Sequence, residues 1–280
     1  MNTDIKYLII PDVHGRDFWI RPVEETLSST AAEIVFLGDY TDPYPKEWVS
    51  DDITWGEVNL ICRTQALERF KRILEIRKMN PKRVTLLLGN HDCAYAIGDD
   101  ICCDRIDGGE RRVIIENLFL DNREEFLLAK ECDIAGRHII FSHAGILKGW
   151  AELVWGQDVV SGQTFNVVDR LNNAWLMKDN DILDKLGYYD NYRGYFGYSH
   201  GSPVWSDLRS WVRVTPEETF GFNICGHTQV RRPVVLDQIC GLDCRKAFYL
   251  DEEGILRHYD SGEEVVNSED TWFFHGRGPR

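Results

Sequence analysis

Five short apolar runs in this 280-residue sequence each end beside a glycine and an aspartate, asparagine or histidine. The runs are rich in residues that favour β-strands. A buried strand that stops in this way carries its polar side chain at the strand's carboxyl end, where open α/β sheets collect their ligands. The segments that follow the runs are, in chain order, Asp12-Val13-His14-Gly15, Gly38-Asp39, Gly89-Asn90-His91, Ser142-His143-Ala144-Gly145 and Gly226-His227-Thr228.

The order of the expected elements indicates an α/β fold. Two apolar strands, at 6–10 and 33–37, flank a helical pattern at 16–29, which predicts a parallel pair joined by a right-handed crossover. Further along, the spacing of apolar residues predicts helices over 57–79, 111–120 and 166–178, a strand over 83–88, a hairpin of 126–133 with 138–141, a strand over 222–225 and a β-meander from 234 to 259.

We expect one domain over residues 1–280, since no internal repeat or linker divides the chain. The proline-containing segment 43–56 is expected to be a lid loop over the site, and its Trp48 and Trp55 either contact a substrate or anchor the loop. Segment 147–205, rich in Trp, Tyr, Asn, Asp and Gly, is expected to be a capping insertion.

Composition indicates which classes of partner the protein can bind and in which cellular compartment it works. With 46 acidic and 32 basic residues the net charge is -14, which argues against a nucleic-acid partner because such binding relies on Lys and Arg. No apolar run has the length of a membrane span, and the first residues lack the pattern of a signal peptide. The eight cysteines follow no disulfide framework, so we expect a cytoplasmic protein with reduced thiols.

The residues at the strand ends form a set of metal ligands. A single such residue is more often a turn or cap residue, but five glycine-flanked ends in one chain argue for a common site. Carboxylate, imidazole and amide groups without a thiolate suit divalent Mn, Fe or Zn better than a structural zinc finger.

The ordered motifs D-x-H-G, G-D-x-x-D, G-N-H-D, S-H-A-G and G-H-T span residues 12–228 and resemble those of the calcineurin-like metallophosphoesterase superfamily. The resemblance implies a four-layer α-β-β-α sandwich, in which two mixed sheets are flanked by helices, with two divalent metal ions at the sheet edge. Carried over by motif, the implied ligands are Asp12 and His14 for the first ion, Asp39 for both, and Asn90, His143 and His227 for the second.

The resemblance also implies the catalytic pair. His91 would donate a proton to the leaving oxygen, and Asp42 would orient its imidazole. Hydroxide activated by the metals would attack phosphorus, and a general acid beside the leaving group would complete the hydrolysis.

Three segments resemble the branch of phosphoprotein phosphatases and bacterial dinucleoside tetraphosphatases. Gln229 stands where many nucleases and phosphodiesterases of the superfamily have a second histidine. Trp205-Ser206-Asp207 resembles the Trp-Ser-Asp segment of that branch, and the G-L-D segment at 241–243 lies near its Asp-Thr-Gly.

Two departures from the branch are clear. Pro43 and Tyr44 follow the G-D-x-x-D motif where an arginine that clamps the phosphate and a glycine are expected, and Asp92 replaces the usual glutamate. Our candidates for the missing clamp are Arg209 and Arg213, although solvated surface arginines would have the same sequence pattern.

The leading interpretation is therefore a phosphatase that hydrolyses phosphate monoesters, either phosphoproteins or small esters. A dinucleoside polyphosphate hydrolase or phosphodiesterase is the alternative, and a non-catalytic binding protein on the same fold is a remote third. Aromatic residues that either stack on a nucleotide or pack in the core are Tyr188, Tyr189, Tyr192, Tyr195, Phe196 and Tyr198.

Overall fold

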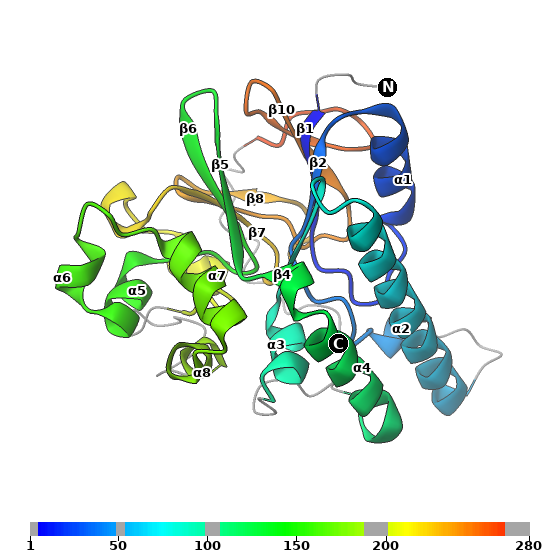
Figure 1. Cartoon of the computed structure of the whole chain (residues 1–280). Coiled ribbons are helices and arrows are strands. Elements are labelled where there is room, and N and C mark those ends of the chain that lie inside the picture. The colour runs from blue at the N-terminus through cyan, green and yellow to red at the C-terminus, as the bar shows by residue number, and fades with distance from the viewer. Residues whose placement is uncertain (1–4, 49–53, 99–106, 188–200, 267–280) are drawn as a thin grey trace.

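The computed structural model describes residues 5–48, 54–98, 107–187 and 201–266. Two β-sheets pack face to face between layers of helices (Figure 1). One sheet has the strand order β11-β10-β1-β2-β3-β4 and the other β5-β6-β7-β9-β8. Both contain parallel and antiparallel pairs, so the predicted four-layer fold with two mixed sheets is confirmed.

The chain builds the first sheet with β1 to β4, then the whole second sheet, and returns to the first sheet with β10 and β11. The first sheet contains β1 (Ile5–Ile10), β2 (Glu33–Phe36), β3 (Val84–Leu87), β4 (Phe126–Leu127), β10 (Phe248–Asp251) and β11 (Leu256–His258). The second contains β5 (Ala129–Ile134), β6 (Arg137–Ser142), β7 (Phe222–Cys225), β8 (Val234–Val235) and β9 (Ile239–Gly241).

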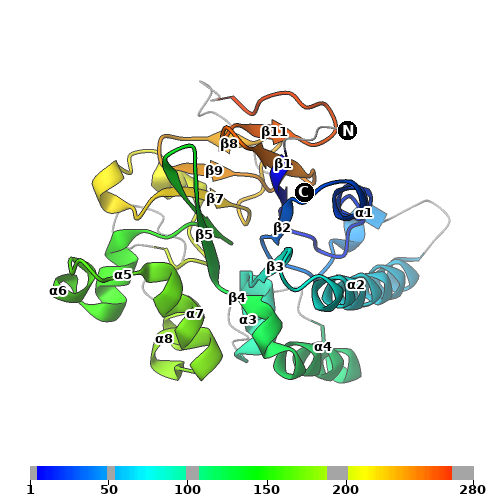
Figure 2. The same cartoon turned by 45° about the horizontal axis from the view of Figure 1, so that its top comes forward.

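Helices cover the outer faces of the sheets (Figures 1 and 2). Those on the side of the first sheet are α1 (Ile20–Ser29), α2 (Trp55–Met79), α3 (Asn90–Ala96) and α4 (Gly109–Asp121). Those between β6 and β7 in the chain are α5 (Lys148–Trp155), α6 (Gln157–Val160), α7 (Val167–Met177) and α8 (Asn180–Gly187). Short 3₁₀ helices are η1 (Pro45–Trp48), η2 (Arg123–Glu125), η3 (Leu208–Trp211) and η4 (Pro216–Glu218).

The side chains of β1 alternate between two hydrophobic cores, which explains why this strand lies between a layer of helices and the second sheet. Tyr7 and Ile9 join the core between the two sheets, whereas Leu8 and Ile10 join the core under the helices. Successive side chains of a strand point to opposite faces, so a strand with apolar residues at consecutive positions, as at 7–10, is buried on both. Such a strand fits only a central position, which is where β1 lies.

The predicted hairpin of 126–133 with 138–141 is wrong at its start. Residues 126–127 form β4, which pairs with β3 in the first sheet, and only β5 pairs with β6. The chain passes between the sheets at Leu128 and Ala129, whose backbone N–H groups donate to the side-chain oxygen of Asn172 on α7. This long-range contact is not visible in the local pattern.

The predicted meander from 234 to 259 is also wrong. β8 and β9 pair in the second sheet, where β9 runs parallel to β7, whereas β10 and β11 pair in the first sheet. The strands have the predicted apolar pattern, but short apolar runs do not specify their partners.

Helix boundaries and number differ from the prediction as well. α2 begins at Trp55 because Thr54 and Glu57 form a capping box, in which each side chain bonds the other residue's backbone N–H. The region 147–187 has four helices where one was expected. No helix in the described ranges combines the length and apolar character needed to cross a membrane.

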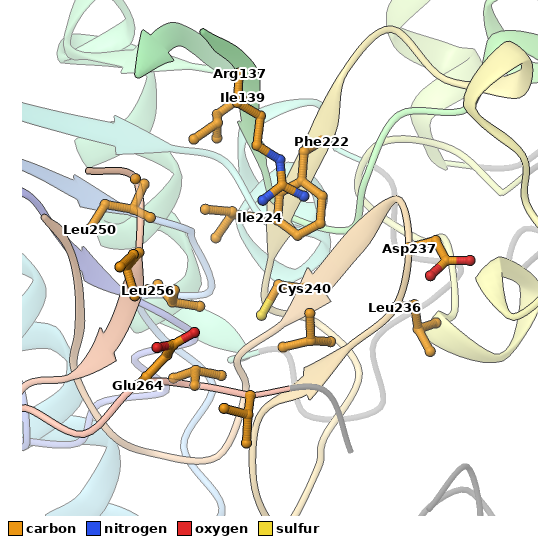
Figure 3. Close-up of a pocket in the computed structure, with 15 residues that line it drawn as sticks. Arg137, Ile139, Phe222, Ile224, Leu236, Asp237, Cys240, Leu250, Leu256 and Glu264 are labelled. Atoms are coloured by element: carbon orange, nitrogen blue, oxygen red, sulfur yellow. The ribbon is translucent and has the colours of Figure 1, made fainter. Parts of the chain in front are cut away.

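A cavity of about 460 Å³ opens between the sheets at the amino ends of β6 and β7 (Figure 3). Its walls include Arg137 and Ile139 of β6, Phe222 of β7 and Leu256 of β11. The Arg137 guanidinium lies 3.6 Å from the centre of the Phe222 ring. None of the residues predicted to bind a metal or a substrate lines this cavity.

Candidate metal centre

The polar residues that follow five strands meet at the carboxyl ends of those strands. β1, β2 and β3 are parallel neighbours, and so are β6 and β7, which brings their following loops to the same edge of the two sheets. Four of these residues are buried and the fifth is half-buried. In chain order they are Asp12, Asp39, Asn90, His143 and His227.

Asp39 lies at the centre of this cluster. Its Oδ2 is 3.4 Å from Nε2 of His14 and 3.6 Å from Nε2 of His143. Two groups of three potential ligands share it, and within each group the donor atoms all lie within 4.8 Å of one another. The groups are His14, Asp39 and His91, and Asp12, Asp39 and His143.

Backbone carbonyls orient two of the histidines. Nδ1 of His14 is 3.1 Å from the carbonyl oxygens of Thr41 and Asp42, and Nδ1 of His143 is 2.8 Å from that of Leu37. Because a carbonyl oxygen only accepts, each Nδ1 carries the proton in the neutral ring. The Nε2 lone pair of each ring is therefore directed toward Asp39, which is the arrangement that metal-binding histidines require.

Asn90 and His227 complete one side of the cluster. Oδ1 of Asn90 is 2.9 Å from Nε2 of His143 and 3.1 Å from Nδ1 of His227. The backbone N–H of His227 donates to both carboxylate oxygens of Asp12, at 2.9 and 3.1 Å, and so links the second sheet to the first. When Nδ1 of His227 carries no proton, these oxygen and nitrogen atoms are all acceptors, and such a set of acceptors fits divalent metal ions.

His91 pairs with Asp42 as the sequence suggested. Nδ1 of His91 is 2.7 Å from Oδ2 of Asp42, a fully buried carboxylate. The structure also places His91 in one of the two potential ligand groups, with its ring 5.0 Å from that of His14. This position is compatible with a proton donor at the edge of the centre and with a metal ligand.

Tyr95 is a member of the site that the sequence analysis did not single out. Its hydroxyl donates to Oδ1 of Asp42 at 2.5 Å and accepts from the backbone N–H of Asp107 at 2.6 Å. Burial, reinforced by the charge of Asp42, raises the pKa of Tyr95, so the hydroxyl keeps its proton and remains a donor. A tyrosine four residues after His91 is one helical turn away, and this spacing was the available signal.

Asp92 organises the backbone of the centre. Its fully buried carboxylate accepts from the N–H groups of Asp39, Gly89 and Tyr40, at 2.6, 2.9 and 3.0 Å. Asp39 has a φ of 54°, in the left-handed region that non-glycine residues rarely adopt. Asp92, one methylene shorter than the glutamate usual at this position, thus bonds the backbone of the loop after β2. These hydrogen bonds hold Asp39 in its left-handed conformation.

The two predicted phosphate arginines lie beyond the Trp-Ser-Asp segment. The guanidinium of Arg209 is bonded to the buried carboxylate of Asp207, with Nε–Oδ1 at 2.8 Å and Nη2–Oδ2 at 2.6 Å. Arg213 is exposed. The segment does adjoin the cluster, because the ring of Trp205 lies 5.4 Å from that of His227.

Other predicted features fall partly outside the described residues. The tyrosines and phenylalanine of 188–200 lie there, as does the 49–53 part of the expected lid. Trp55, at the other end of that segment, is the first residue of α2 and is 55% exposed, so it does not anchor the loop to the core.

Comparison with known proteins identifies the family of this chain and shows structures with a similar fold. A family model described as calcineurin-like phosphoesterase matches residues 5–231. A cold-active protein tyrosine phosphatase has a TM-score of 0.52 at 15% identity, over 94% of this chain and 78% of that one, which shows a common fold. A serine/threonine phosphatase from Saccharomyces cerevisiae, described as similar to human phosphatase PP5, has a TM-score of 0.48 at 13% identity, over 96% and 82%. No curated protein matches the sequence significantly.

Proposed function

This chain belongs to the calcineurin-like phosphoesterase family, and from that premise we propose that it is a dinuclear metal-dependent phosphatase that hydrolyses phosphate monoesters. The substrate is a phosphoprotein or a small phosphate ester. The observation that carries the proposal is the position of Asp39, which both groups of potential metal ligands share. A carboxylate between two sets of ligands is what a pair of neighbouring cations requires.

We assign the ligands as the motifs imply. Asp12 and His14 would hold the first ion, Asp39 would contribute to both, and Asn90, His143 and His227 would hold the second. The short distances among the nitrogen and oxygen atoms of these residues support one shared site. The division of ligands between the two ions follows the motifs, because by distance alone Asp12 groups with His143 and His14 with His91. Bound divalent cations of the Mn, Fe or Zn type supply Lewis-acid activation of water and neutralise charge on the phosphoryl group.

In this proposal His91 donates the proton that the leaving oxygen needs. The bond from Nδ1 of His91 to Asp42 fixes the ring and directs Nε2 away from that carboxylate. Tyr95 occupies the other oxygen of Asp42, so the carboxylate cannot turn away from the imidazole. An oriented imidazole is a general acid suited to neutral pH.

The net charge and the free cysteines inform the choice of substrate class and of cellular location. The net charge of -14 disfavours a nucleic-acid substrate, which together with Gln229 makes a nuclease the poorer interpretation. All six cysteines within the described ranges are free thiols, and four of them are buried. We therefore keep a cytoplasmic location as part of the proposal.

The test measures metal content and turnover in the same preparation. We expect about two divalent ions per chain and hydrolysis of p-nitrophenyl phosphate that requires added Mn and is abolished by a chelator. Two bound ions without turnover, over several divalent metals, would instead favour a non-catalytic binding protein on this fold. A panel of a phosphopeptide, diadenosine tetraphosphate and bis(p-nitrophenyl) phosphate then separates the monoesterase from the polyphosphate hydrolase and the phosphodiesterase.

A further inference from the structure

Two arginines hold the carboxylate of Glu47, in the segment where a phosphate-clamping arginine was expected and absent. Nε and Nη2 of Arg16 donate to its two oxygens at 2.9 and 3.1 Å, and Nη2 of Arg245 lies 2.6 Å from Oε1. A guanidinium fork that binds two oxygens of one anion, with a second guanidinium beside it, is the geometry by which proteins bind phosphate.

This cluster of Arg16, Arg245 and Glu47 lies beside the candidate metal centre. Arg16 directly follows the D-x-H-G motif, and its Nη1 is 3.5 Å from the carbonyl oxygen of Asp12. The guanidinium lies 5.1 Å from the centre of the Tyr44 ring, and that ring packs edge-on against His14 at 4.9 Å. Arg16 is only 9% exposed, so the fork is built into the protein and is not a chance surface contact.

The two arginines interact electrostatically with the acidic residues around the candidate metal centre. Asp243 is buried, and burial followed by the carboxylate of Asp12 raises its pKa, whereas Arg16 and Arg245 lower it. The arginines therefore lie within electrostatic reach of the acids of the centre. Burial disfavours the charged form of Arg16, but the hydrogen bonds and charge of Glu47 outweigh it and raise the pKa of the guanidinium.

We propose that Arg16 and Arg245 form an anion subsite next to the metal centre, which Glu47 fills and which a second phosphate of the substrate takes by displacing Glu47. The inference rests on the proposed function and refines its substrate class: a small molecule with a further phosphate close to the one that is hydrolysed. A phosphate carries more charge than the carboxylate it displaces, so exchange at a double-arginine site favours the phosphate.

The alternative is that Glu47 only anchors η1 through Arg16 and Arg245. The two roles predict opposite results for Glu47→Gln. If Glu47 competes with a substrate phosphate, the variant gains selectivity for substrates with a second phosphate. If Glu47 is an anchor, the variant loosens the segment that carries Tyr44 and lowers the binding and kcat/KM of all substrates alike.

The experiment compares ADP with AMP, which share the nucleoside and differ in one phosphate. Binding to the metal-free protein in the presence of a chelator is measured by calorimetry, and kcat/KM is measured with saturating Mn. We expect the ADP-to-AMP ratio to fall about tenfold in Arg245→Gln and to rise severalfold in Glu47→Gln, the range expected when a hydrogen bond to a charged group is removed. Arg245 is half-exposed, so its variant is expected to fold.

The matched control is Arg21→Gln. Arg21 is an exposed arginine that forms ion pairs with Glu25 and Asp260, away from the centre, so its variant must keep the wild-type ratio. An unchanged ratio in Arg245→Gln, or equal losses for both nucleotides in Glu47→Gln, would overturn the subsite. Absence of p-nitrophenyl phosphate turnover would refute the proposed function instead, and the metal-free binding data would still decide the subsite.

Discussion

The two ends of the sheet sandwich differ in the polar groups that they bury and in the conformation of their loops. The carboxyl ends of β1, β2, β3, β6 and β7 hold a compact group of buried acids, imidazoles and an amide, whereas the amino ends of β6 and β7 border a cavity of about 460 Å³ with a mixed polar and apolar lining. Of the seven described residues other than glycine with left-handed backbone, four are in the loops at the carboxyl ends of the strands, namely His14, Asp39, Asp42 and His227, and none lines the cavity. Left-handed backbone and buried charge, and not open volume, distinguish the end that we propose to be functional.

The strongest test of this contrast is Asp39→Asn. Loss of the shared charge should remove at least one metal ion and lower kcat/KM for p-nitrophenyl phosphate by about 10²–10³-fold or more, the cost of losing one preorganised electrostatic group. Metal analysis and steady-state kinetics measure both effects. Glu264→Gln, a charge removed from the cavity wall, serves as the control and should change neither. Retention of two ions and most of the activity in Asp39→Asn would break the assignment of the centre.

His91→Asn should have the next largest effect. A general acid contributes about 10²–10⁴-fold, and the loss should be greatest for substrates with poor leaving groups, which need the proton most. The measurement is kcat over a series of aryl phosphates together with metal content. Since the ring of His91 lies within one of the potential ligand groups, loss of an ion from this variant would show that His91 is a metal ligand.

Tyr95→Phe should have a smaller effect of the same kind. Without the hydroxyl, Asp42 holds His91 less firmly, and groups that orient functional side chains typically contribute about 10–100-fold. Kinetics over the same aryl phosphate series should show a loss that grows as the leaving group becomes poorer. Tyr7→Phe removes a buried hydroxyl elsewhere between the sheets and is the matched control. An equal loss in both variants would mean that the effect is on stability.

The smallest effect on activity is expected at the cavity. Ile139→Val removes one buried methylene from its wall and should lower the free energy of unfolding by about 0.5–1.5 kcal/mol. Urea unfolding of the metal-free protein measures this change, and kcat/KM should stay within about twofold of wild type. A larger loss of activity would show that the two ends of the sandwich are coupled.

Sequence reasoning succeeded where the signal is local. The apolar runs before Asp12, Asp39, Asn90, His143 and His227 are strands, and the structure brings their ends together as the pattern indicated. It failed where partners are distant in the chain. The split of residues 126–134 between two sheets depends on Asn172, more than forty residues away, and no short apolar run specifies such a partner.

The sequence by itself determined which residues are available for chemistry: the glycine-flanked candidate ligands at strand ends, the pair of His91 and Asp42, and the absence of an arginine after Asp42. Only the tertiary structure decided how they are held. Asp92 reaches across to the backbone of Asp39, and Arg16 closes on Glu47, thirty-one residues away. The physical reason is that periodicity records the environment of each residue, whereas hydrogen bonds and charge pairs between loops depend on how the sheets pack.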